Sequence, residues 1–334
     1  MERTVTQRIL LQRITLITLA VLSCAALSTF WSTASAEGRS TPSLAPMSLT
    51  DLEDDITALQ HDKLAPIAVQ QFAHEHALAL GSVDGEFNWK KAELNFTPLG
   101  PGTHSWLVQA TFEEKLMGYM IISATDQGQL KLSEYGSGEQ SPYDRELLSH
   151  ALERQHLSLT MIHADGGELG LRYALPLLAY WKVERPNQEA LYIDATNGDL
   201  LPSETLRQIE TTSKPMVIID TVASATSSWL VDSIHMRPTF NPMDNLLWIT
   251  SKPVKLTRVQ DWIQLHKELG IVYSANDRNI FYGGPLPISG YQLWHNKAES
   301  QSVLYVAIGG HTSTQRFVPL DTLLEDGQFY VANP

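Results

Sequence analysis

The sequence predicts an α+β fold in which helices pack on antiparallel sheets, arranged as two to three small modules. Two patterns predict this class: segments whose apolar residues recur at helical spacing, and segments in which every second residue is apolar. Short runs rich in Gly, Pro, Asn and Asp separate the alternating segments, as expected for strands joined by tight turns. With 43% hydrophobic residues, the chain can bury a substantial core.

The first 36 residues have the three parts of a secretory signal peptide. An apolar stretch covers residues 14–27, and the small residues of a cleavage site follow at Ala34-Ser35-Ala36. The basic residues that precede the apolar stretch are Arg3, Arg8 and Arg13. We therefore predict cleavage after Ala36 and a secreted, extracellular protein that begins at Glu37.

Two alternatives for the N-terminus stay open, and both leave the protein membrane-anchored. Leu22-Ser23-Cys24 resembles a lipobox, in which Cys24 would be acylated. The apolar stretch could also remain as an uncleaved anchor, although it is short for the ~20 residues of a spanning helix. Cys24 is the only cysteine, so cleavage after Ala36 would leave a chain with no disulfide, thiolate nucleophile or cysteine metal ligand.

The chain carries an excess of acidic residues, with a formal net charge of −13. Nucleic acids and anionic lipids bind clusters of Lys and Arg, so this charge argues against both as partners. We expect no nucleic acid and, after cleavage, no membrane partner.

A flexible leader is expected over residues 37–47, because this stretch is polar and contains proline. Residues 48–140 follow as a first module. It begins with a helix capped by Ser48, and a second helix runs from Pro66 to Gly81. Four strands of an antiparallel meander are then predicted, from alternating apolar residues at about 92–96 and 106–112, a short apolar run at 118–124, and the apolar residues of 130–135.

Residues 141–202 form the second predicted module, with one helix and two strands. The helix starts at Ser141-Pro142 and ends near His156. The strands cover residues 171–184 and 189–194, and Asn197-Gly198 marks the next turn. Residues 202–215 are polar and end in Lys214-Pro215, which indicates a module boundary.

The last module, residues 216–334, is predicted to be mixed, with a helix at about 258–269 and strands at 303–308 and 316–320. This part is rich in aromatic residues, which serve equally in a core or at a recognition surface. Within it we single out Tyr291 and Trp294 as candidates for a binding surface.

Two stretches resemble modules of peptidase propeptides. Residues 117–124, with Gly136-Ser137-Gly138, resemble the pro-segment of streptopain-type peptidases. Residues 179–183 and 192–201 resemble the hairpin of PepSY modules. The resemblance covers about residues 50–202. It implies a helix-plus-sheet module that covers or modulates a peptidase, and it names no catalytic residue.

The C-terminal part has a fainter resemblance to a papain-like fold. Residues 303–310 followed by His311 resemble the strand that precedes the histidine base of those peptidases. A papain-like enzyme also needs a cysteine thiolate, which the cleaved chain lacks. This resemblance therefore implies a degenerate domain that keeps a peptide groove, with His311 in its lining.

The sequence singles out no catalytic residue, no cofactor and no metal site. His74 and His76 lack the i, i+4 spacing of a helical zinc site, so both are interpreted as solvated residues of an exposed face. Asp194 is expected to bond the backbone of its own turn, with a calcium site that includes Asp199 as the alternative.

These observations predict a secreted, non-catalytic protein that binds an extracellular protein or peptide, with peptidases among the candidate partners. Two alternatives remain open. One is an extracellular hydrolase that uses carboxylates, and the other is the degenerate papain-like domain.

Overall fold

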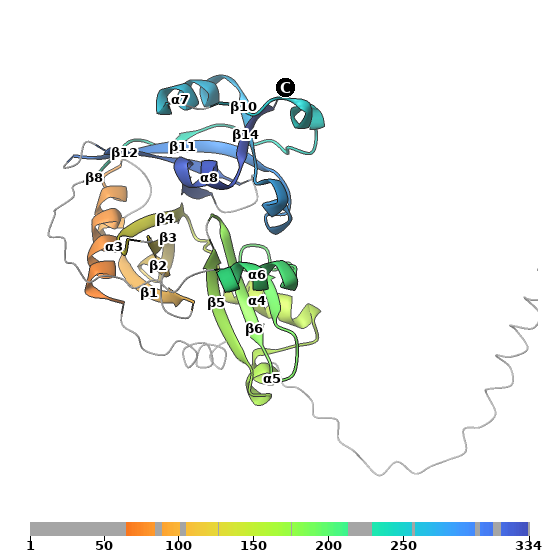
Figure 1. The fold of residues 1–334 in the computed structure, drawn as a ribbon. Coiled ribbons are helices and arrows are strands. Elements are labelled where there is room, and N and C mark those ends of the chain that lie inside the picture. Colours follow the sequence, from red (N-terminus) through yellow and green to blue (C-terminus); the bar gives the residue numbers. More distant parts are fainter. Residues whose placement is uncertain are drawn as a thin grey trace, which may run out of the picture. The chain divides into compact units, whose positions relative to one another are not determined.

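The computed structural model describes residues 65–83, 89–100, 105–125, 127–174, 176–212, 229–255, 258–297, 301–309 and 315–332. The signal-like segment, the leader, the helix expected from Ser48, and His311 lie outside these residues. Helices and two antiparallel sheets, one of eleven strands and one of three, make up the described part (Figure 1). The α+β prediction is therefore confirmed.

The first helix and the four-strand meander form where the sequence predicts them. Helix α3 (Ile67–Leu80) begins after Pro66 and ends at Gly81. The strands that follow are β1 (Glu93–Leu99), β2 (Ser105–Phe112), β3 (Lys115–Ala124) and β4 (Leu130–Ser137). Each pairs with the next in antiparallel register.

The interpretation of His76 as solvated is wrong. His76 lies with Val69, Ala73 and Leu80 on the buried face of α3, whereas His74 is exposed.

The C-terminal part supplies the other strands of the large sheet. Its elements are β8 (Trp229–Val231), β9 (His235–Met236), η2 (Leu246–Thr250), α7 (Val259–Glu268), β10 (Gly270–Ser274), η3 (Asn276–Phe281), β11 (Leu286–Asn296), β12 (Gln301–Ile308), β13 (Arg316–Pro319), α8 (Leu320–Asp326) and β14 (Gln328–Ala332). The main strand order is β1-β2-β3-β4-β13-β12-β11-β10-β14, and β8 and β9 pair with β11. The predicted helix and the two predicted strands are present here, although the chain turns into α8 at Leu320.

Pairing of β4 with β13 makes the large sheet continuous. Gly136 lies opposite Arg316, and Tyr135 lies opposite Phe317. The sheet therefore runs through residues that the sequence assigns to two separate modules, 48–140 and 216–334. All the described residues belong to one compact unit.

The smaller sheet consists of β5 (Glu168–Ala174), β6 (Leu178–Glu184) and β7 (Leu191–Asp194), with helices α4 (Arg145–Arg154) and α5 (Leu159–Ala164) before it. The prediction of one strand over 171–184 is wrong, because the chain reverses between Ala174 and Leu178. Leu177 lies in the left-handed region there, with φ of 69°, and is buried.

Helix α6 (Ser203–Thr212) occupies most of the stretch that the sequence assigns to a boundary. It lies over the small sheet in Figure 1, with Leu206 fully buried. Glu210 of this helix accepts hydrogen bonds from the hydroxyl groups of Tyr180 and Tyr192 at 3.2 and 3.3 Å, and it pairs with Lys182 at 2.9 Å. The small sheet and α6 thus form one packed layer.

One apolar cluster joins the two sheets. Tyr119 and Ile121 of β3 are buried in it together with Trp181 of β6 and Ile193 of β7. Tyr119 and Ile121 are two positions apart, so the strand period predicts that they share one face, and all four side chains face the interior. Gly118 allows the backbones of β3 and β4 to approach closely, because a Cβ atom at this position would lie 2.5 Å from the carbonyl oxygen of Gly136.

No helix among the described residues is both long enough and apolar enough to cross a membrane.

Candidate functional site

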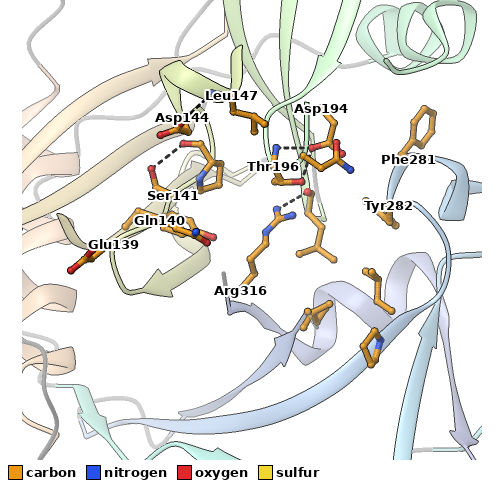
Figure 2. Close-up of a pocket in the computed structure, with 18 of the residues that line it drawn as sticks. Glu139, Gln140, Ser141, Asp144, Leu147, Asp194, Thr196, Phe281, Tyr282 and Arg316 are labelled. Carbon is orange, nitrogen blue, oxygen red and sulfur yellow. Dashed lines mark hydrogen bonds between the residues drawn. The ribbon is translucent and has the colours of Figure 1, made fainter. Parts of the chain in front are cut away.

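A cavity of about 690 Å³ lies where the end of the small sheet meets residues of β3, β11, β12 and β13 (Figure 2). Ligand pockets in proteins commonly have volumes of about 300–1,000 Å³. The lining residues come from β3, the segment between β4 and α4, the first turn of α4, the turn after β7, and the C-terminal strands. The fold therefore brings together segments that lie far apart in the sequence.

The cavity has an apolar interior and a polar rim. The buried lining residues are Tyr119, Pro142, Leu177, Asp194, Phe281, Pro287 and Ile308. The exposed lining residues are Glu139, Gln140, Asp144, Glu146, Thr196 and Asn197. Apart from Asp194, the buried set offers apolar and aromatic surface, whereas the exposed set offers carboxylates, amides and a hydroxyl group. This division is typical of a site that anchors an apolar group and orients the polar group next to it.

A buried ion pair forms part of the cavity wall. Glu134 of β4 is fully buried and accepts two hydrogen bonds from Arg316 of β13, with Nε at 2.7 Å and Nη2 at 2.8 Å. The hydroxyl groups of Tyr119 and Tyr173 donate to the same carboxylate at 2.6 and 2.8 Å. Arg316 Nη2 also donates to the carbonyl oxygen of Leu177 at 2.6 Å. The pair thus connects the large sheet to the small one.

Burial and charge shift the pKa values of Arg316 and Tyr119 in this cluster. Burial lowers the pKa of the Arg316 guanidinium, but Glu134 reverses this effect and holds that pKa well above its ordinary value. Burial, followed by the charge of Glu134, raises the pKa of the Tyr119 hydroxyl group well above its usual range. Tyr119 therefore stays protonated and acts as a donor. Among the described residues of the lining, Arg316 is the only basic one, and it is paired with Glu134.

Asp194 lies at the end of β7 and points toward the cavity (Figure 2). Its Oδ1 accepts hydrogen bonds from the backbone N–H of Thr196 at 2.7 Å and from its hydroxyl group at 2.6 Å. Burial raises the pKa of Asp194, and these bonds to Thr196 act in the opposite direction. The prediction that Asp194 bonds the backbone of its own turn is confirmed.

Across the described residues, no group of three or more His, Cys, Asp or Glu side chains could hold a metal ion.

Two further carboxylates of the rim lie at the start of α4. Asp144 caps this helix by accepting a hydrogen bond from the backbone N–H of Leu147 at 2.9 Å, and Glu146 lies in the first turn. Acidic side chains at this end of a helix interact favourably with the helix dipole.

A second cavity, of about 290 Å³, shares Glu139, Ser141 and Asp144 with the first. The segment 139–144 therefore contributes to both cavities. Gln109 of β2 donates a hydrogen bond to the Ser141 hydroxyl group at 2.9 Å, which ties this segment to the large sheet. An extended ligand that crosses the segment could contact both cavities.

The aromatic residues singled out from the sequence are core residues. Tyr291 is 3% exposed and packs edge-on against Trp262, and Trp294 is 1% exposed and packs against Tyr135. Their proposed role in a binding surface is therefore wrong. Both residues belong to the hydrophobic core, which was the alternative for the aromatic residues of this part of the chain. His311 lies outside the described residues, but Ile308 and Gly309 shortly before it line the larger cavity.

Sequence reasoning missed the residues that the site depends on. Glu134 and Arg316 are charged residues within apolar strands, which is unusual unless they are paired. Their charge within apolar strands was the available signal, but a separation of 182 positions in the sequence gave no indication that they are partners.

Comparisons with protein-family models, with curated proteins and with solved structures found no match to this chain.

Proposed function

We propose that this protein is a secreted, non-catalytic binding protein that holds a segment of an extracellular protein or peptide in the larger cavity. A peptidase is one partner that would fit the resemblance of residues 50–202 to propeptide modules. The observation that carries the proposal is a cavity of about 690 Å³ with a buried apolar lining and an exposed polar rim. The adjoining smaller cavity supports an extended ligand, since the two share three residues of one segment.

The carboxylates of the cavity favour binding over hydrolysis. A carboxylate hydrolase needs one acid and one base or nucleophile aimed at the scissile bond. Asp144 and Asp194 instead each use an oxygen to hold nearby backbone, through Leu147 and Thr196. These bonds orient the two side chains as parts of a wall.

A peptide-selection experiment tests this function. A phage-displayed library of random peptides would be selected on the purified protein, and the affinity of the enriched peptides would be measured by calorimetry. Leu147→Trp on α4 and Leu286→Trp on β11 each place a large side chain at the cavity from a different element. We expect either substitution to weaken binding by at least about tenfold, which corresponds to about 1.4 kcal/mol.

The matched control is Leu324→Trp, at an exposed position of α8 outside the lining. It should bind the enriched peptides as the unmodified protein does. Failure to enrich any peptide, or equal binding by folded Leu147→Trp and Leu286→Trp, would contradict the proposal.

Export is the other part of the proposal and has its own test. The segment up to Ala36 has the pattern of a cleaved signal peptide, so N-terminal sequencing of protein recovered from the medium should begin at Glu37. A lipid-blocked Cys24, or an intact Met1, would show membrane attachment instead.

A further inference from the structure

The larger cavity carries an unbalanced negative charge. Among the described residues, its lining holds the carboxylates of Glu139, Asp144, Glu146 and Asp194 and one guanidinium, that of Arg316. Glu134 already binds that guanidinium through two hydrogen bonds within the protein, so the charge of Arg316 is shared with a carboxylate outside the lining. Figure 2 shows Glu139, Asp144 and Asp194 on different sides of the space in front of Arg316.

The exposed carboxylates lie at the rim of a concave, apolar wall, where their negative charge can attract a cationic ligand. Asp144 and Glu146 lie at the N-terminal end of α4, and both are exposed at the rim. A concave wall of low polarity concentrates the field of such charges more than a flat, solvated surface does. The buried apolar lining, which includes Leu177, Phe281 and Ile308, supplies that wall.

We infer that the cavity selects a cationic peptide group: a bulky apolar side chain enters the apolar interior while an adjacent ammonium or guanidinium group meets the carboxylates of the rim. This inference rests on the proposed function and adds the ligand chemistry. The cation could belong to a Lys or Arg side chain or to a free amino terminus, because both present the same charged donor. The remaining acidic surface of the chain, with its net charge of −13, attracts such a ligand as well.

Four synthetic peptides separate these cases. Each contains the same Phe-Leu core and an amidated carboxyl terminus. Three have an acetylated amino terminus and carry Lys, norleucine or Glu beside the core, and the fourth carries norleucine with a free amino terminus. We expect calorimetry to show the Lys and free-amine peptides binding at least about tenfold more tightly than the blocked norleucine peptide, with the Glu peptide weakest. A preference that high salt reduces would agree with interactions at an exposed rim.

The rim carboxylates can be neutralised without removing the helix cap. In the double variant Asp144→Asn, Glu146→Gln, asparagine still caps α4. We expect the preference for Lys over norleucine to fall below about threefold in this variant. The charge-matched control is Glu93→Gln, Glu168→Gln, at exposed positions outside both cavities, and it should keep the full preference.

The outcomes distinguish this inference from the function on which it rests. Binding of the Lys, norleucine and Glu peptides with equal affinity overturns the cation preference and leaves peptide binding intact. Full preference in a folded Asp144→Asn, Glu146→Gln variant also overturns it. If none of the four peptides binds, and the displayed library yields none either, both proposals are wrong.

Discussion

At the scale of single residues, Glu134 and Arg316 form an ion pair whose burial is energetically costly. Two charges are removed from water, and the cost of this is offset only because every available partner is present: two guanidinium contacts, two tyrosine hydroxyl groups and one backbone carbonyl. Removal of one partner leaves the other charge buried and uncompensated.

We therefore predict that Arg316→Met lowers the free energy of unfolding by about 3–5 kcal/mol. Urea denaturation measures this loss. The double variant Glu134→Leu, Arg316→Met should be less destabilised than the single variant, because it leaves no unpaired charge at the junction. A double variant less stable than Arg316→Met would show that the pair contributes more than it costs.

His76 predicts a dependence of stability on pH. It is buried on α3, its Nδ1 lies 2.8 Å from the carbonyl oxygen of Phe72, and its ring stacks on the Phe72 ring at 4.0 Å. Burial lowers its pKa to about 4, and the hydrogen bond to Phe72 only partly opposes this. Between pH 6.5 and 4 the unfolded chain therefore binds a proton at this residue that the folded chain does not bind.

The folded state should lose stability as the pH falls through this interval, by up to about 3 kcal/mol from His76 alone. His76→Phe keeps an aromatic ring on Phe72 and removes the titration. Urea denaturation at several pH values should give a shallower slope for this variant than for the unmodified protein. Identical slopes would mean that His76 titrates normally.

At the scale of the elements, the sequence predicts best where the periodicity is strict. Apolar residues alternate in the sequence of β1 and β2 and run continuously in β3, and α3 starts after a proline and stops at a glycine, so the bounds of these elements are close to those predicted. The turn between β5 and β6 has no such signal. It contains no Gly or Asn and is built around buried Leu177, and only Pro176 indicates a break.

Helix α6 was missed for the opposite reason, since it is almost entirely polar. Its apolar contacts come from Leu206 and Ile209, and its docking depends on the polar contacts of Glu210 with the small sheet. The candidate site was not predictable for a similar reason. Its lining joins turns and strand ends whose neighbours are decided by tertiary pairing, not by local pattern.

Trp181 tests the packing of the small sheet on the large one. Its ring lies in the cluster with Tyr119, Ile121 and Ile193, and it meets the Tyr143 ring edge-on. We expect Trp181→Ala to cost about 3–5 kcal/mol of stability in urea denaturation, from lost burial and the cavity left behind. Leu78→Ala, at an exposed position of α3, is the control and should cost less than about 1 kcal/mol. A similar loss in both variants would contradict this packing role.

At the scale of the whole molecule, the continuous large sheet predicts a single cooperative unfolding transition. Residues of β2 and β3 and residues of β11 and β12 lie in one sheet, joined through the pairing of β4 with β13. Hydrogen exchange followed by mass spectrometry at increasing urea should show peptides from these two regions becoming exposed together. Transitions that differ by more than about 0.5 M urea would indicate two independently stable halves.

The pairing of β4 with β13 also bears on how the chain reaches this state. Gly136 and Arg316 are separated by most of the protein, and contacts between such distant residues form slowly because a long loop must first close. The β1 to β4 meander can form early, but its β4 edge finds its neighbour only when residues 316–319 arrive, close to the C-terminus. Until then that edge is open to wrong partners, so aggregation during refolding should be sensitive to deletion of the last strands. The large sheet is therefore completed late, because β13 joins its two halves, even if the meander forms before residues 316–319 are available.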